Sequence, residues 1–169
     1  MIIIKWVFLG LIFGTSLIIG FLISKKYSNR VEILKEFKNA INILETKMKF
    51  TYEPLREIFD EISNLSSDSI SNIFLNANKK MENLPASDAW QEAVSSSNLD
   101  LKDEDINVLS RMGKMLGKTD LEGQVSEIEL TLSFLDNQIK NAEEEKTKNS
   151  KLYKTLGVTL GLAIIIILM

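Results

Sequence analysis

The chain of 169 residues contains no cysteine and no histidine. Without cysteine, disulfide bonds, thiolate nucleophiles and zinc–thiolate sites are excluded. Without histidine, the commonest general base, the commonest metal ligand and every Ser–His or Cys–His nucleophile pair are missing. The sequence also has no GxxxxGK[ST] phosphate-binding loop. We therefore expect a protein that is not an enzyme and that binds no metal and no cofactor.

Residues that form turns are also scarce, with two prolines and eight glycines in the whole chain. The regular alternation of Val or Thr with polar residues that is typical of strands is absent, which favours helices. Pro54 and Pro85 separate amphipathic segments and are expected at helix boundaries. The sequence predicts an all-α fold in which six helices form an antiparallel bundle, with hydrophobic membrane helices at the N- and C-terminal ends.

The first apolar segment, residues 6–23, carries no charge. Its 18 residues would span about 27 Å as a helix, close to the hydrocarbon thickness of a bilayer. Lys25, Lys26 and Arg30 follow it, and cationic residues there keep the rest of the chain in the cytoplasm. The alternative, a cleaved signal peptide, would need a small-x-small cleavage site, and none follows this segment.

The second apolar segment, residues 155–169, is shorter, at about 22 Å of helix. The side chain of Lys154 can lengthen it by reaching toward the headgroups. A buried core helix is the alternative. We expect three regions: a transmembrane helix (1–24), a cytoplasmic helical bundle (25–151), and a C-terminal transmembrane or membrane-inserted helix (152–169).

Small residues at four-residue spacing occur in both apolar segments, a pattern that lets membrane helices approach closely. Gly157 and Gly161 lie near the cytoplasmic edge of the second segment, and Ser16 and Gly20 lie at the same depth in the first. We expect these four residues to pack together within one chain. That would leave a second pair, Gly10 and Gly14, for another subunit or a partner.

The middle of the chain carries apolar stripes at helical spacing. One stripe predicts that the first helix continues from the membrane to about Phe50, and a heptad pattern predicts a last helix that continues into the second apolar segment. Gly117 is expected to end the fifth helix in the left-handed conformation, and Thr119 with Glu122 is expected to open the sixth as a capping box. The stripe residues are Ile33, Phe37, Ile41, Leu44 and Met48 in the first helix, and Val125, Ile128, Leu132, Leu135, Ile139 and Ala142 in the last.

Charge is unevenly placed along the chain. Residues 24–49 hold seven Lys and Arg against three Asp and Glu, a net charge of +4 that suits anionic lipid headgroups. Residues 50–145 hold eight against twenty, a net charge of −12 that argues against nucleic acid as a partner. The acidic region either attracts a basic partner or is a solvated surface. A calcium loop beginning at Asp103 is excluded because Val108 stands where the loop requires glycine.

Several motifs in order give the chain a resemblance to a known family over nearly its whole length. The most specific is Met112–Asp120 (MGKMLGKTD), which is followed by Gln124. With this motif and three others, the chain resembles the stage III sporulation protein AB family of endospore-forming bacteria. The other motifs are the turn KFTYEPL at Lys49–Leu55, the helix that begins Asp88-Ala89-Trp90, and the run Lys154–Gly157 with the apolar residues after it.

The resemblance implies a fold like the cytoplasmic domain of the inner-membrane F protein of type II secretion and type IV pilus machines. It also implies a place in the mother-cell membrane that faces the forespore, with the bulk of the chain cytoplasmic, in a channel-like assembly. The implied partners are a cytoplasmic secretion-type ATPase and other stage III sporulation membrane proteins, with a homo-oligomer possible. A membrane-anchored regulator or assembly chaperone of another transporter is the alternative.

The segment between the fifth and sixth helices is the candidate contact for such a partner. It contains Gly113, Gly117, Asp120 and Gln124. The competing interpretation is structural, because Gly117 and Asp120 suit the end of one helix and the start of the next.

Overall fold

The computed structural model describes residues 2–168, which form six helices and no strand. The predicted all-α fold with long apolar helices at both ends is therefore confirmed. By contacts the chain divides into two compact units, one formed by residues 1–31 with 141–169 and the other by residues 32–140. The helices are α1 (Ile2–Phe50), α2 (Leu55–Leu65), α3 (Asp68–Lys80), α4 (Ala86–Ser95), α5 (Asp103–Gly113) and α6 (Leu121–Leu168).

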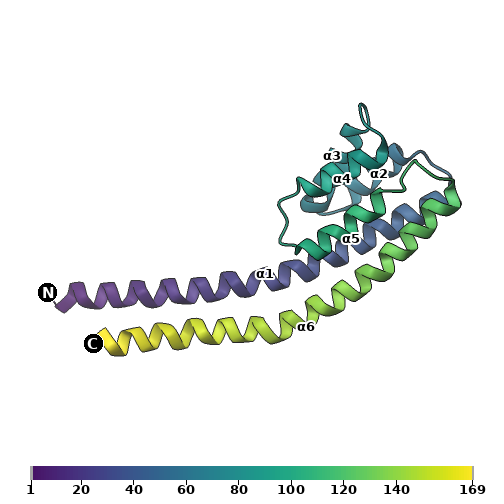
Figure 1. Cartoon of the computed structure of the whole chain (residues 1–169). Coiled ribbons are helices and arrows are strands. Elements are labelled where there is room, and N and C mark those ends of the chain that lie inside the picture. The colour runs from purple at the N-terminus through teal and green to yellow at the C-terminus, as the bar shows by residue number, and fades with distance from the viewer. Residues whose placement is uncertain (1, 169) are drawn as a thin grey trace. The chain divides into compact units, whose positions relative to one another are not determined.

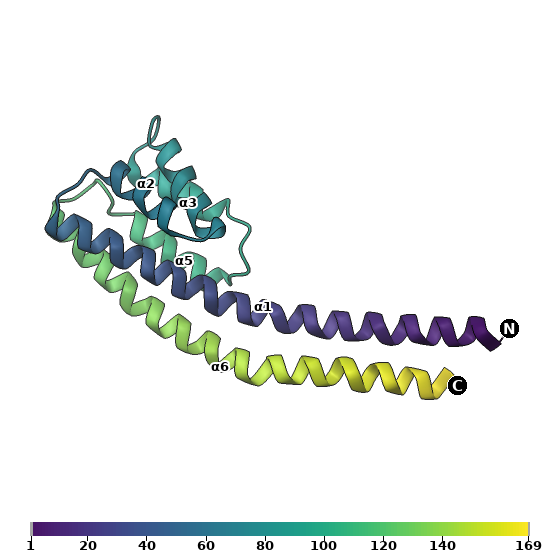
Figure 2. The same ribbon diagram turned by 180° about the vertical axis from the view of Figure 1, so that it is seen from behind.

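In the unit of residues 32–140, the four short helices pack on the adjoining parts of α1 and α6 (Figure 1, and from behind in Figure 2). Successive short helices contact one another, α2 with α3, α3 with α4, and α4 with α5. Ion pairs join the long helices here, from Lys38 to Asp136 and from Lys49 to Glu129. Because the higher number on α1 pairs with the lower number on α6, the two helices run antiparallel, as predicted.

Aromatic side chains form the centre of this unit. Phe59, Phe74 and Trp90 are fully buried, and their ring centroids lie 5.0–5.7 Å apart at steep angles, an arrangement that aromatic pairs favour. The indole Nε1 of Trp90 donates a hydrogen bond to the carbonyl oxygen of Leu109 at 2.7 Å. The three rings thus join α2, α3 and α4, and the hydrogen bond ties them to α5.

The buried stripes differ slightly from those predicted. On α1, Leu34 is fully buried and Ile33 only half-buried, so the core face keeps the spacing of Leu34, Phe37, Ile41 and Leu44. On α6, Thr131 is buried where Leu132 was expected. The hydroxyl of Thr131 donates to the carbonyl of Glu127 at 2.9 Å, which satisfies the buried group within its own helix.

Two turns contain left-handed residues. Gly117 has φ +70° between α5 and α6, in the conformation that was predicted for it. It does not end α5 as expected, because that helix already ends at Gly113. Tyr52 has φ +55° between α1, which ends at Phe50 as expected, and α2. A residue with a Cβ atom costs about 1–2 kcal/mol in this conformation, whereas glycine is free of that penalty.

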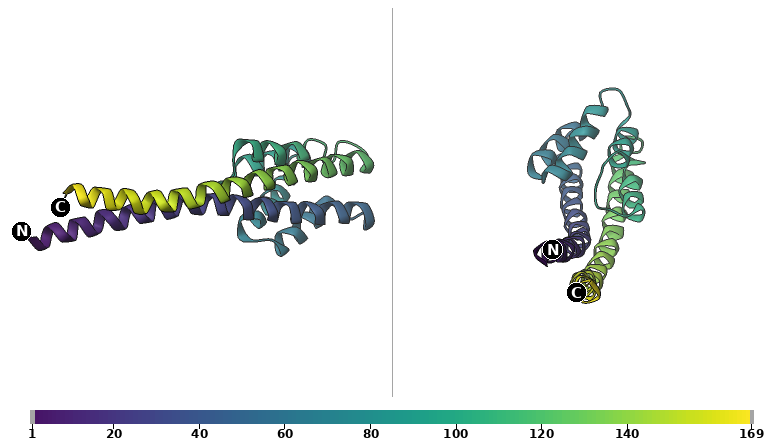
Figure 3. Two further views of the ribbon diagram at one scale, coloured as in Figure 1. Left: turned by 90° about the horizontal axis from the view of Figure 1, so that it is seen from below. Right: turned by 90° about the vertical axis from the view of Figure 1, so that its left-hand side faces the viewer.

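In the other unit, the beginning of α1 lies antiparallel to the end of α6 (Figure 3). The hydroxyl of Ser16 donates to the carbonyl oxygen of Gly157 at 2.7 Å. The hydroxyls of Ser24 and Ser150 share a hydrogen bond of 2.5 Å. α6 reaches Leu168 without a break, so the predicted continuation of the last helix into the apolar segment is confirmed.

Gly113 lies directly under the Trp90 ring, and a Cβ atom on it would stand 2.2 Å from the ring carbon Cδ1. We predict that Gly113→Ala destabilises the bundle by about 1–3 kcal/mol, because the ring must shift within a packed core. Thermal unfolding of the full chain in detergent, followed by circular dichroism, measures the change. Asn107→Ala, at an exposed position of the same helix, is the control. A Gly113→Ala variant as stable as this control would contradict the packing described.

Candidate functional site

The turn that joins α5 to α6 is closed by the residues predicted to mark it. The Oδ1 atom of Asp120 accepts a hydrogen bond from the Gly123 backbone N–H at 3.0 Å, which caps the start of α6. The side chain of Gln124 accepts from the Gly117 N–H at 2.9 Å and donates to the Thr119 carbonyl at 2.8 Å. Gln124 therefore holds the turn through hydrogen bonds to the backbone of two residues, Gly117 and Thr119.

The predicted capping box is wrong in one respect, because α6 begins at Leu121 and its cap is Asp120 rather than Thr119. The hydroxyl of Thr119 is buried without a hydrogen-bond partner among the described residues. Thr and Asp are both good caps and stand one residue apart, so local propensity does not choose between them. The structure starts α6 at Leu121, which makes Asp120 the cap.

The four residues of this predicted contact segment are not equally accessible. Gly113 is buried against Trp90 and fits the structural interpretation. Gly117 and Asp120 are exposed, and Gln124 is half-exposed. Only the last three can meet a partner from solvent.

The four small residues predicted to pack between the apolar segments lie together. A Cβ atom on Gly20 would stand 2.7 Å from the carbonyl oxygen of Tyr153 and 3.2 Å from the Cα atom of Gly157. One on Gly157 would stand 3.0 Å from the carbonyl oxygen of Ser16, and one on Gly161 would stand 2.7 Å from the Phe13 ring. These distances leave no room for side chains. The two backbones touch directly at Gly20 and Gly157, whereas Gly161 lies against the ring of Phe13.

Gly10 and Gly14 behave differently, since a Cβ atom on either would meet nothing within 4 Å. Large apolar side chains are exposed beside them, with Phe8 at 61% and Leu11 at 59%. This face of α1 has no partner among the described residues.

Further contacts join α1 and α6 beyond the apolar segments. The sequence did not predict them. The guanidinium of Arg30, 5% exposed as a residue, lies 2.8 Å from the carboxylate of Glu145. The rings of Tyr27 and Tyr153 stack with centroids 6.0 Å apart. The pairing register of α1 and α6 was the missing information, because each of these partners lies more than a hundred residues away in sequence.

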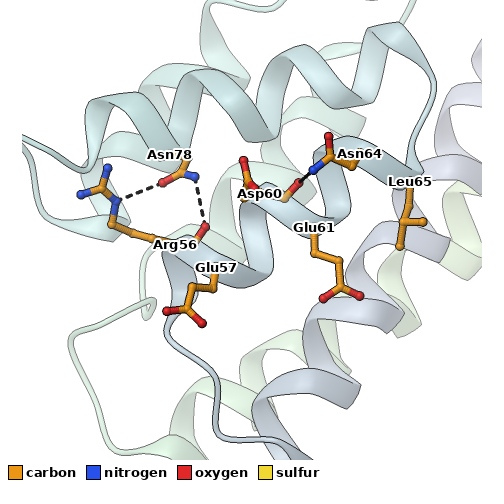
Figure 4. Close-up of a pocket in the computed structure, with 7 residues that line it drawn as sticks. All are labelled: Arg56, Glu57, Asp60, Glu61, Asn64, Leu65 and Asn78. Carbon is orange, nitrogen blue, oxygen red and sulfur yellow. Dashed lines mark hydrogen bonds between the residues drawn. The ribbon is translucent and has the colours of Figure 1, made fainter.

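A shallow groove of about 550 Å³ runs along α2 and is edged by Asn78 of α3 (Figure 4). Glu57, Asp60 and Glu61 line it, with Leu65 at one end. Arg56 also lines the groove, but its guanidinium lies against the side chain of Asn78, at 3.1 Å, and Glu82, at 3.3 Å.

The carboxylates that line the groove face solvent or an ammonium group. No group of three or more His, Cys, Asp or Glu residues able to hold a metal ion occurs between residues 2 and 168. Glu61 pairs with Lys47 at 2.7 Å. The groove is thus an acidic surface, open to solvent.

Ion pairing is strong where α1 ends. Lys49 contacts Glu45 and Glu129, and these hydrogen bonds raise the pKa of the Lys49 ammonium. The hydrogen bond from Lys49 in turn lowers the pKa of the Glu129 carboxyl. One ammonium group thus faces two carboxylates, so this cluster keeps an excess of negative charge.

The helices α1 and α6 are each long and apolar enough to cross a membrane. In the most apolar 18-residue stretch of each helix, only 17% of the residues in α1 and 11% of those in α6 are buried. A core helix of a soluble protein would be mostly buried. The low burial favours membrane insertion over the alternative of a buried core helix.

Comparisons with known proteins agree with this architecture. The family model of stage III sporulation protein AB matches residues 5–169. The stage III sporulation protein AB of Bacillus subtilis (strain 168) is 28% identical over 154 residues, which cover 89% of this chain and 90% of that protein. A solved structure of stage III sporulation protein AB (SpoIIIAB) has a TM-score of 0.67 at 22% identity, covering 71% of this chain and 98% of its own, and supports the fold. Since the family model spans nearly all of the sequence, the chain belongs to the stage III sporulation protein AB family.

Proposed function

We propose that this protein is a non-enzymatic membrane component of a secretion-like sporulation complex, in the mother-cell membrane around the forespore, where its cytoplasmic bundle is a platform for a secretion-type ATPase. The observation that carries the proposal is the continuity of α1 and α6, each of which runs unbroken from an apolar segment into the acidic bundle. A force applied to the bundle by a motor would therefore pass along two helices into the membrane. Membership of the sporulation family supplies the biological setting.

The distribution of charge supports both the contact with the membrane and the contact with the ATPase. Lysines at 25, 26, 148, 151 and 154 are exposed next to the apolar segments, where they suit anionic headgroups of the cytoplasmic leaflet. The bundle carries the opposite sign, with a net charge of −12 over residues 50–145. A basic face of the ATPase would be attracted to it at long range.

Contacts within the membrane would use two faces of α1. Ser16 and Gly20 face Gly157 and Gly161 of the same chain, whereas Gly10 and Gly14 are open. We propose that the open face packs against another subunit or another stage III sporulation membrane protein. The exposed part of the α5–α6 turn, at Gly117, Asp120 and Gln124, is a second candidate for partner contact.

One prediction of the proposed function concerns the ATPase. We expect the full chain to co-purify with the secretion-type ATPase from sporulating cells, and the affinity to fall as salt rises from about 0.05 to 0.5 M because charge attraction is screened. Deletion of the gene should stop sporulation after engulfment. Co-purification with an unrelated transporter instead, outside sporulation, would favour a regulator or assembly chaperone and overturn the platform.

Another prediction concerns the pairing of α1 with α6. Because the natural sequence has no cysteine, only introduced cysteines can form a disulfide. In a Ser24→Cys, Ser150→Cys variant, we expect oxidation in native membranes to form a disulfide within one chain, seen as faster migration on a non-reducing gel. Adding Gly20→Leu should abolish most of this cross-link, because a side chain there collides with the backbone of α6.

Gly10→Leu in the same cysteine background is the matched control and should leave the cross-link intact, since that position is open. Equal cross-linking with Gly20→Leu and Gly10→Leu would show that the glycine contact does not hold α1 and α6 together in the membrane.

A further inference from the structure

Two aromatic side chains at the end of α1 are exposed in a unit that buries most of its other rings. Phe50 is 76% exposed and Tyr52 is 74% exposed, whereas Phe37, Phe59, Phe74 and Trp90 are fully buried. Phe134, the next most exposed ring of this unit at 36%, is covered by the guanidinium of Arg111, 5.3 Å from the ring centroid. Aromatic side chains bury more apolar area than most others when a surface is covered, so Phe50 and Tyr52 are suited to binding.

The backbone at Tyr52 gives an independent reason to look for a function there. Its φ of +55° is a conformation in which glycine or asparagine is the usual choice. The same chain uses glycine for the equivalent purpose at Gly117, where φ is +70°. The turn itself needs only a left-handed residue, because the contact that closes it is made by the backbone N–H of position 52, which donates to the carbonyl of Lys47 at 3.2 Å. The fold therefore does not explain a tyrosine at this position.

The helix that follows carries two carboxylates that no side chain of residues 2–168 pairs with. Glu57, in the first turn of α2, and Asp60, one turn later, are exposed and lack an ion-pair or hydrogen-bond partner for their carboxylates within residues 2–168. Like charges three residues apart on a helix repel. Arg56, the cation nearest in sequence, is directed to Asn78 instead (Figure 4) and also reaches Glu82.

We infer that Phe50 and Tyr52, together with the α2 groove at Glu57 and Asp60, form one docking surface for a basic protein segment. The rings would enter apolar pockets of that segment, and its Lys or Arg side chains would pair with the two carboxylates. Aromatic anchors beside charged residues are typical of the residues that dominate interface energy. The inference rests on the proposed function and assigns the face by which the bundle binds the ATPase.

Charge complementarity distinguishes this occupant from two others. An anionic membrane surface would be repelled by Glu57 and Asp60. A second copy that met this surface with its own equivalent would place carboxylates against carboxylates. A cationic protein segment relieves the repulsion on α2 and covers both rings.

The test separates stability from binding in the full chain, purified in detergent. We expect Tyr52→Gly to unfold at the same temperature as the natural protein or at a higher one, since glycine removes the left-handed strain. Its affinity for the ATPase should fall at least about tenfold. Glu57→Gln with Asp60→Asn should also weaken binding and make it less dependent on salt. Leu75→Ala, a truncation of an exposed apolar residue on α3, is the control and should bind normally.

Each other result is decisive. If the natural protein binds the ATPase and Tyr52→Gly binds it equally well, this surface is wrong and the platform proposal stands. If the natural protein does not bind the ATPase, the platform fails and this inference fails with it. If Tyr52→Gly instead changes sedimentation of the protein alone, or its binding to phosphatidylglycerol vesicles, the occupant is a second copy or the membrane, and the inference is overturned.

Discussion

The close approach of α1 and α6 at Gly20 and Gly157 is the constraint on which the pairing of the apolar segments depends. Two apolar helices in hydrocarbon gain little from burying apolar surface against each other, so backbone contact and polar bonds must hold them. The glycines allow the contact, and the hydrogen bond from Ser16 to the Gly157 carbonyl fixes its register. The bond between Ser24 and Ser150 and the ion pair of Arg30 with Glu145 continue that register along the same two helices.

Residues 32–140 are held by a different means. Here the packing of Phe59, Phe74 and Trp90 replaces backbone contact, and short helices that could not persist alone are stabilised by the face they bury. Charged side chains are left to the surface, where many of them form ion pairs across helices. The carboxylates of Glu57 and Asp60 are among those that no ion pair reaches within residues 2–168.

In the function proposed for this protein, surfaces and stiff helices carry the role. A membrane-anchored platform requires continuous helices, exposed lysines next to the apolar segments and an acidic bundle. Tyr52 illustrates the cost of such a role, since the chain accepts conformational strain and an exposed ring where glycine would serve the fold better.

The sequence by itself determined the helical class, the two apolar segments, the turns at Pro54 and Gly117, and the family, because periodicity, composition and motifs are local properties. It identified the buried face of α1 at Phe37, Ile41, Leu44 and Met48 and was one residue off only at its first position, where Leu34 rather than Ile33 is buried. It also opened α6 with a capping box at Thr119, whereas the cap is Asp120, since neighbouring residues of similar propensity differ only in what they pack against. The pairing of Arg30 with Glu145 and the burial of Gly113 under Trp90 were decided by the tertiary structure alone. Both depend on which helices meet and in which register, and that information resides in contacts between distant parts of the chain.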